Sequence, residues 1–248
     1  MDKYDLSSLR IITYGAAPTP VELLKKALKI FGRRLLQIYG QAEAPITITL
    51  LGSEEHFLNG EATEAQVKRL SSVGRPYSTV EVRVVDNEGK DVKPGEVGEI
   101  IVRSPHCMVG YWNRPDATAE TLRNGWIYTG DLATVDDREY IFIVDRAKDI
   151  IISGGYNVYA REVEEVLYSH PAVREAAVIG IPDDKWGEAV KAIVALKPGT
   201  QVTEKELIEY CKQNLASYKK PQSIEFMLEL PKSAVGKICL LYTSDAAD

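Results

Sequence analysis

Hydrophobic residues recur with a helical spacing in one early stretch of the chain. Val21–Phe31 has apolar positions three and four residues apart, Thr19 stands before it as an expected N-cap, and Gly32 follows it. Short apolar runs on either side, Leu9–Thr13 and Leu35–Ile38, predict buried strands, and each is followed by a tyrosine and a glycine. This order predicts an α/β sheet, in which ligands bind at the carboxyl ends of the strands.

Further along the chain the pattern changes to an alternation of period two. Thr79–Asp86 and Val97–Arg103 alternate apolar and polar residues and are separated by turn residues. This spacing predicts a small antiparallel barrel or sheet. The polar stretch before it, Gly52–Ser72, is expected to be a solvated connector with one exposed helix over Glu61–Leu70. His56 on this connector is expected to be an exposed surface histidine.

The last third of the chain alternates helical and strand patterns. Ala160–Ser169 has an apolar face opposite a charged one, and Thr203 with Glu206 forms a capping box that opens a helix running to about Asn214. The predicted strands are Val173–Ile181, Val190–Leu196 and Ser223–Met227. The alternation predicts a small α+β domain.

Between these parts lies a charged segment flanked by strands. The apolar, β-branched runs Tyr140–Val144 and Ile150–Ile152 enclose Asp145–Asp149, and Ser153-Gly154-Gly155 follows them. From the residues alone, one interpretation is a surface hairpin with a solvated turn.

Composition narrows the functional classes. The chain has 248 residues, 45% of them hydrophobic and 27% charged, with a net charge of −6, so it is neither a basic nucleic-acid binder nor a disordered protein. It has no apolar run of the roughly 20 residues that a membrane-spanning helix needs. No signal peptide is expected, because Met1–Asp5 is polar and acidic. Its three cysteines fit neither a disulfide framework nor a zinc pattern. A cytoplasmic protein is expected, with peripheral membrane contact and the oligomeric state left open.

The motifs together resemble those of the adenylate-forming superfamily, which includes acyl-CoA synthetases, the adenylation domains of peptide synthetases, and luciferases. The matching segments are Tyr14–Pro18, Tyr39–Glu43, Ser72–Pro76, Gly95–Ile100, Gly110–Pro115, Trp126–Leu132, Asp145–Asp149 and Pro231–Lys237. The resemblance implies the C-terminal part of a large AMP-binding domain over residues 1–145, in which 72–145 is barrel-like. A hinge over 146–149 and a small mobile domain over 150–238 would follow.

The resemblance also implies roles at a nucleotide site. Glu43 would hold Mg²⁺, Tyr39 would pack beside adenine, and Asp131 would accept hydrogen bonds from the ribose hydroxyls of ATP, with Arg146 as a ribose or phosphate partner. Residues that would line the acyl, adenine and phosphate positions are Gly15, Ala16, Ala17, Pro18, Gly40, Gln41 and Ala42. Ala42 stands where the family has Thr, so one hydrogen bond to phosphate is expected to be missing.

The resemblance implies roles for a second group of residues, which lie further along the chain. Lys237 would be the catalytic lysine of adenylate formation, and Lys148 would lie in the hinge. Positions expected to contact coenzyme A are Ser153, Gly154, Gly155, Trp186, Tyr218 and Lys220, the two aromatic side chains as stacking partners for adenine.

These residues imply a carboxylate–CoA ligase that uses ATP, Mg²⁺ and coenzyme A on a fatty or aryl carboxylic acid, whose identity the sequence does not reveal. Two alternatives stay open: an adenylation domain that loads a carrier-protein thiol, and a non-catalytic binding module. The family's upstream phosphate-binding loop is absent, so we expect the C-terminal half of a synthetase, inactive by itself. Cys239–Asp248 resembles a translated sequencing adapter and is left out of the functional argument.

Overall fold

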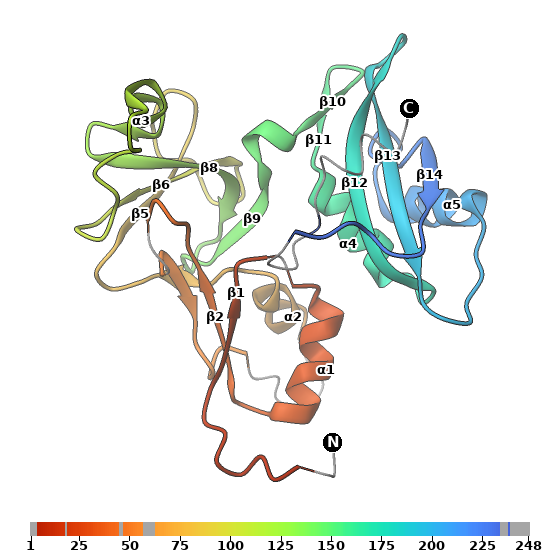
Figure 1. Ribbon diagram of the computed structural model, residues 1–248, viewed down its shortest axis with the longest axis horizontal. Helices are drawn as coiled ribbons and strands as arrows, with labels where there is room; N and C mark the ends of the chain where they lie inside the picture. The colour runs from red at the N-terminus through yellow and green to blue at the C-terminus, as the bar shows by residue number, and fades with distance from the viewer. Residues whose placement is uncertain (1–3, 18, 45–46, 57–62, 234–237, 239–248) are drawn as a thin grey trace. The chain divides into compact units, whose positions relative to one another are not determined.

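The computed structural model describes residues 4–17, 19–44, 47–56, 63–233 and 238. The chain divides into two compact units, Met1–Ile143 and Val144–Asp248 (Figure 1). Each unit has sheets and helices of its own, and each is described by itself below.

The first sheet of the first unit is built around the predicted strand–helix–strand segment. Strands β1 (Ile12–Gly15) and β2 (Leu35–Tyr39) pair in parallel, and helix α1 (Val21–Phe31) connects them. Strands β3 (Thr49–Leu51) and β4 (Arg75–Pro76) extend the sheet in antiparallel fashion. The α/β prediction is therefore confirmed.

The C-terminal cap of α1 is the one predicted from the sequence, whereas the N-terminal cap is not. Gly32 closes the helix with a φ of 61° and donates its N–H to the Leu28 carbonyl oxygen, as a C-terminal glycine does. At the start, Pro20 occupies the N-cap position and no side chain caps the helix, so the prediction of Thr19 as N-cap is wrong. A proline at the cap supplies the extended entry to the helix but offers no side-chain acceptor.

The second sheet of the first unit is antiparallel, as the alternating pattern predicted. Its order is β5-β6-β8-β7, with β9 paired to β8. The elements are β5 (Glu81–Val85), β6 (Gly98–Arg103), α3 (Pro115–Thr121), β7 (Leu122–Arg123), β8 (Trp126–Val135) and β9 (Ile141–Arg146). Its buried residues, among them Ile100 and Val102, share a core with Tyr39 of the first sheet and with Ile48, which directly precedes β3.

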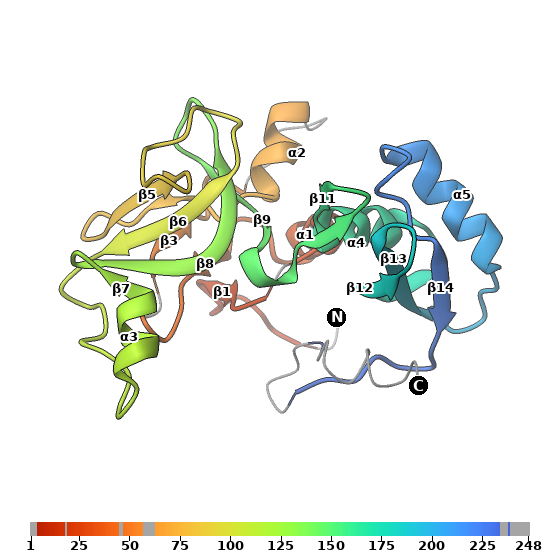
Figure 2. The same ribbon diagram turned by 90° about the horizontal axis from the view of Figure 1, so that it is seen from above.

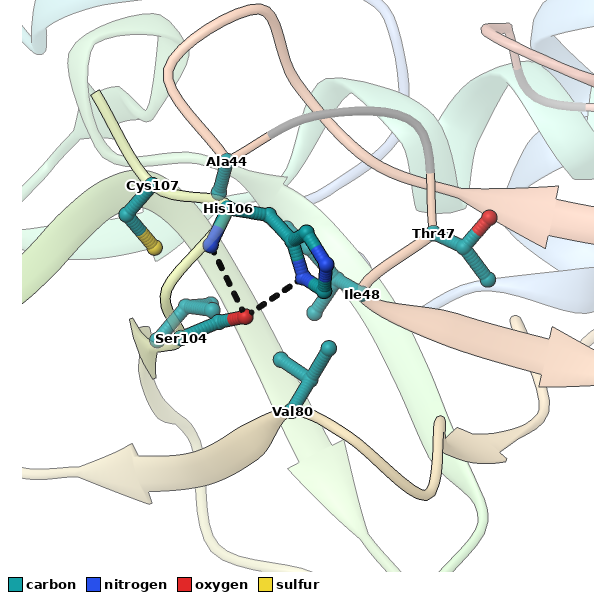
Figure 3. Close-up of a pocket in the computed structure, with 8 residues that line it drawn as sticks. Ala44, Thr47, Ile48, Val80, Ser104, His106 and Cys107 are labelled. Carbon is teal, nitrogen blue, oxygen red and sulfur yellow. Dashed lines mark hydrogen bonds between the residues drawn. The ribbon is translucent and has the colours of Figure 1, made fainter.

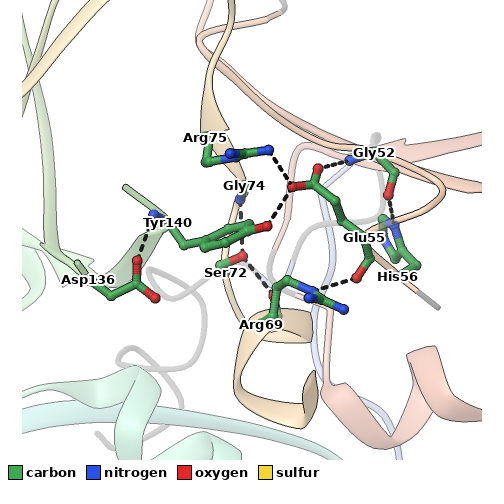
Figure 4. Close-up of polar contacts among 9 residues, drawn as sticks. All are labelled: Gly52, Glu55, His56, Arg69, Ser72, Gly74, Arg75, Asp136 and Tyr140. Atoms are coloured by element: carbon green, nitrogen blue, oxygen red, sulfur yellow. Dashed lines mark hydrogen bonds and ion pairs between the residues drawn. The ribbon is translucent and has the colours of Figure 1, made fainter. Parts of the chain in front are cut away.

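The connector between the two sheets is less solvated than expected. Its helix α2 (Glu64–Leu70) begins at Thr63 with a capping box. His56 has no exposed surface, so the prediction of a surface histidine is wrong. Both ring nitrogens have partners. Nδ1 lies 2.8 Å from the Gly52 carbonyl oxygen (Figure 4). Nε2 lies 2.7 Å from the Tyr14 hydroxyl. These two partners satisfy the imidazole and make its burial favourable.

The second unit is one sheet with helices on one face. The sheet order is β11-β10-β13-β12, and β14 pairs in parallel with β13. The elements are a short 3₁₀ turn η1 (Ala147–Asp149), β10 (Ile151–Ser153), β11 (Tyr156–Val158), α4 (Ala160–Ser169), β12 (Val173–Asp183), β13 (Gly187–Leu196), α5 (Glu204–Asn214) and β14 (Ser223–Phe226). Both helices and all three main strands were predicted from the sequence.

Alternation along β12 explains how this sheet is covered on both sides. Ala176 and Val178 pack with Leu167 of α4 and Leu207 of α5. Their neighbours Ala177 and Ile179 face a second cluster that contains Leu230. Because successive side chains of a strand point to opposite faces, this one strand contributes to both cores.

The hairpin interpretation of the charged segment is wrong. Strand β9 pairs with β8, whereas β10 pairs with β11 and β13, so the two strands that flank the segment are not partners. Within the described part of the chain, no helix combines the length and the apolar character needed to cross a bilayer.

Candidate functional site

The tightest polar cluster of the first unit joins the end of β2 to β8. Asp131 is 5% exposed, and its Oδ2 accepts a hydrogen bond from the Tyr39 hydroxyl at 2.6 Å. Gln41 Nε2 donates to the same oxygen at 2.7 Å and to the Thr129 carbonyl oxygen at 2.9 Å. Two predicted sites far apart in sequence thus meet, and the two donors fix the rotamer of the carboxylate.

The turn after β1 lies at the same edge of the parallel strand pair. Gly15 pairs with Ile38 of β2, and a Cβ at Gly15 would lie 2.1 Å from the Ile38 carbonyl oxygen, so only glycine fits there. Ala16 has a φ of 64°, which is uncommon for a residue with a side chain. The predicted Pro18 falls outside the described residues. The geometry places Gly15–Ala17 and Tyr39–Gln41 at neighbouring strand ends, where open α/β sheets bind ligands.

Glu43, the predicted magnesium ligand, is half-buried and oriented by one neighbour. The Tyr111 hydroxyl donates to Glu43 Oε1 at 2.7 Å. Among the described residues no group of three His, Cys, Asp or Glu side chains could hold a metal ion. A single oriented carboxylate fits Mg²⁺, which keeps several waters and is completed by substrate phosphates rather than by a protein cage. Tyr111 was not predicted as part of this site.

A cavity lined in part by Ala44, the residue after Glu43, is too small to hold a substrate. Its volume is about 10 Å³, the size of a single water. Ala44 and Cys107 line it, and Ser104 Oγ lies 2.9 Å from His106 Nδ1 at its edge (Figure 3). Burial raises the pKa of the Cys107 thiol, which keeps the thiol protonated at neutral pH. This cavity therefore offers neither an acyl pocket nor a nucleophile.

The second unit carries a much larger hollow. Its volume is about 750 Å³. Its lining contains Ser153, Gly154, Tyr156, Trp186, Ser217, Tyr218, Lys220 and Gln222. The rings of Tyr156 and Tyr218 stack with centroids 4.8 Å apart and planes at 30°. Of the described residues that line the hollow, Lys220 alone carries a charge. Aromatic faces beside one cation and several hydroxyl and amide groups suit a flat base that carries phosphate.

Most residues predicted for the thiol acceptor therefore line one surface. Ser153, Gly154, Trp186, Tyr218 and Lys220 all belong to the hollow, whereas Gly155 is exposed beside it and not part of the lining. Sequence analysis missed Tyr156, although its position directly after the glycine pair is a signal that could have found it.

The remaining predicted residues also lie in the second unit. Arg146 ends β9, and Lys148 lies in the turn η1, exposed to solvent. The neighbouring Asp145 accepts hydrogen bonds from the backbone N–H groups of Arg146 at 2.8 Å and Arg161 at 3.4 Å. Burial raises the pKa of Asp145. Lys237 lies outside the described residues.

Family models match a stretch of each unit. The model of the AMP-binding enzyme family matches residues 1–112, and the model of the AMP-binding enzyme C-terminal domain matches residues 162–237. The chain belongs to the AMP-binding enzymes. It is 44% identical over 240 residues to a long-chain-fatty-acid–CoA ligase of Bacillus subtilis, an alignment that covers 96% of this chain and 41% of that relative.

Solved structures of two synthetases share the fold. The amide bond synthetase McbA from Marinactinospora thermotolerans matches with a TM-score of 0.91 and 38% identity, over 100% of this chain and 49% of that one. The o-succinylbenzoate CoA synthetase MenE from Bacillus subtilis, solved with ATP and a magnesium ion, matches with a TM-score of 0.79 and 37% identity, over 92% of this chain and 45% of that one. The chain thus spans less than half the length of each protein compared.

Proposed function

We propose that this chain contributes the ribose-binding and thiol-binding parts of a carboxylate–CoA ligase. The observation that carries the proposal is the Tyr39–Gln41–Asp131 cluster, a buried and oriented carboxylate at the carboxyl edge of a parallel strand pair. A carboxylate accepts hydrogen bonds only, so it suits the two hydroxyl donors of a ribose.

The reaction would proceed in two steps. In the first, a carboxylate oxygen of the acid attacks the α-phosphorus of ATP and the P–O bond to pyrophosphate breaks. Asp131 would hold the ribose during this step, and Glu43 would hold Mg²⁺, which neutralises phosphate charge when bound. Lys237 would stabilise the charge that develops on the transferring phosphate.

In the second step the thiolate sulfur of coenzyme A attacks the acyl carbonyl, and AMP leaves with the bonding electron pair. The hollow of the second unit supports this choice of acceptor. Tyr218 and Trp186 would stack on the adenine of coenzyme A, and Lys220 would meet its phosphate. A carrier-protein acceptor would bring a phosphopantetheine arm, without the adenine and the further phosphates of coenzyme A that this lining suits.

A chimera provides the test. Residues 5–238 would replace the matching stretch of the Bacillus subtilis ligase, and the product would be assayed for carboxylate-dependent ATP–pyrophosphate exchange and for CoA-dependent release of AMP. We expect both activities, and we expect Asp131→Ala to raise the KM for ATP by about tenfold or more, because a charge-assisted hydrogen bond is worth roughly 1.5–3 kcal/mol.

Three results would contradict the proposal in different ways. An unchanged KM for ATP in Asp131→Ala would show that Asp131 does not bind the ribose of ATP. If AMP is released in the presence of a carrier protein but not of coenzyme A, the thiol acceptor is a carrier protein and not coenzyme A. A chimera that folds, shown by a cooperative unfolding transition, but exchanges no pyrophosphate would favour a binding module over a catalytic one.

A further inference from the structure

The strand that carries Asp131 is irregular where this residue lies. In the ladder between β6 and β8, Glu99 pairs with Leu132 and Ile101 pairs with Tyr128, with a register shift between the two pairs. A single residue separates the pairs on β6, whereas residues 129–131 separate them on β8. Strand β8 therefore bulges here, and it bends along its length (Figure 2).

A bulge leaves backbone groups without ladder partners, and side chains satisfy them here. Gly130 N–H donates to Glu99 Oε1 at 2.8 Å. Thr129 Oγ1 donates to the Ile100 carbonyl oxygen at 2.7 Å and accepts from Asp131 N–H at 3.1 Å. The bulged backbone is therefore held in one conformation by Glu99 and Thr129, because buried backbone groups left unpaired would be unfavourable.

The conformation of Gly130 shows why this support is needed. Its φ is 70°, in the left-handed region, although a Cβ there would meet no atom within 4 Å. Glycine is therefore favoured here by the positive φ of the backbone and not by a lack of room for a side chain. A glycine has broad conformational freedom, so a hydrogen bond on its N–H does much to select this one conformation.

We infer that Glu99 is a positioning residue for nucleotide binding, whose carboxylate holds the bulge that directs Asp131 toward the ribose. It acts through Gly130 and does not itself touch the nucleotide. This inference rests on the proposed role of Asp131. Glu99 belongs to the segment Gly95–Ile100, which matches the family's motifs but to which the sequence analysis gave no role at the nucleotide site.

Three substitutions separate the hydrogen bond from the charge. Glu99→Gln keeps an oxygen that can accept from Gly130 N–H. Glu99→Ala removes the acceptor and leaves that N–H unpaired. Glu99→Asp keeps the charge but withdraws the oxygen by one methylene. A matched control is Glu81→Ala on β5 of the same sheet, since Glu81 is exposed and pairs only with the Arg103 side chain among the described residues.

The decisive measurement is the preference for ribose, because a merely destabilised protein would lose affinity for every nucleotide alike. The 248-residue chain, labelled with ¹⁵N, would be titrated with AMP and with 2′,3′-dideoxy-AMP while the amide signals of Gly130 and Asp131 are followed. We expect the chain to bind AMP at least about tenfold more tightly than the dideoxy nucleotide. Glu99→Gln and Glu81→Ala should keep most of this preference, and Glu99→Ala and Glu99→Asp should reduce it toward one.

Two failures are distinguishable. If the unmodified chain binds both nucleotides equally, Asp131 does not bind the ribose hydroxyls, and the role that the proposed function gives to Asp131 is wrong. If the unmodified chain prefers AMP and Glu99→Asp, folded by its amide spectrum, keeps the full preference, then Glu99 does not position Asp131 and this inference is overturned.

Discussion

Gly154 lies directly against the indole ring of Trp186. Its N–H donates to the Trp186 carbonyl oxygen at 2.8 Å, and a Cβ at Gly154 would lie 2.8 Å from Trp186 Cε3. Ser153 and Gly154 of the predicted Ser-Gly-Gly motif therefore line the same hollow of the second unit as Trp186, which lies more than thirty positions further along the sequence.

Gly154→Ala should consequently destabilise the second unit and displace the indole. The new methyl group must push Trp186 aside, and the φ of 60° disfavours alanine as well. We expect a loss of about 2–4 kcal/mol in the free energy of unfolding, measured in urea. The neighbouring Gly155→Ala is the control: its φ is 83°, but no atom lies within 4 Å of its Cβ, so it should lose only the backbone part of about 1–2 kcal/mol. Equal losses would show that the Trp186 contact contributes nothing.

His56 should make the first unit sensitive to acid. Burial lowers the pKa of His56 below its ordinary value of 6.5, and the nearby Arg69 lowers it further, while the Gly52 hydrogen bond and Glu55 act in the opposite direction. Because the folded pKa lies below the unfolded one, the stabilisation is present above about pH 6.5 and is lost as the pH falls through the folded value.

The measurement is the free energy of unfolding between pH 8 and pH 5. His56→Gln should flatten this profile, whereas His106→Gln, at an exposed histidine, should leave it unchanged. A profile with the same slope in His56→Gln and the unmodified chain would show that His56 does not couple protonation to folding.

Glu164 should give the second unit the opposite pH dependence. Burial raises the pKa of Glu164 from 4.5 to about 7, and the nearby Asp145 adds to the effect. The folded state therefore keeps a proton that the unfolded state releases, so stability falls as the pH rises from 4.5 to about 7.

Glu164→Gln is expected to remove this fall. A glutamine can still accept the hydrogen bond that Val178 N–H makes to Glu164 Oε1 at 3.0 Å, and it carries no charge to desolvate. The variant should thus be more stable than the unmodified chain at pH 8 and about equal to it at pH 4.5, as measured by urea unfolding. Glu165→Gln, at the exposed neighbouring position, serves as the control. A constant difference at all pH values would contradict the assignment.

The proposed hinge can be tested with two prolines at adjacent positions. Ala147 is the first residue of the turn η1, and Arg146 before it is extended, with ψ at 140°. Proline suits the first position of a helical turn after an extended residue, so Ala147→Pro should preserve this turn. Lys148→Pro instead disfavours the helical conformation of Ala147 and should break it.

In the chimera described above, we expect Lys148→Pro to retain adenylate formation and to lose thioester formation. The physical reason is that the two proposed steps need different groups at one site, which the chain would supply by rotating about a few backbone torsions. The measurement is the rate of each half-reaction, the second from a supplied acyl-adenylate. Unchanged rates in both half-reactions would place the hinge elsewhere.

The sequence by itself determined the elements whose signals are local. Helices α1, α4 and α5 follow from apolar spacing, and the capping box at Thr203 is present in the structure because its partners lie three residues apart. Several residues of the candidate sites, among them Gly15 and Asp131, also lie in motifs that are local in the sequence, whereas Tyr111 and Tyr156 were not predicted.

Only the tertiary structure decided what depends on partners distant in the chain. The sequence around His56 is polar, yet the side chain is buried because Tyr14 and Gly52 satisfy both ring nitrogens. The role of Glu99 arises from a register shift between two strands, which no local pattern encodes. Burial and register are properties of pairs of segments, and the hydrogen bonds that stabilise them form only when the chain has folded.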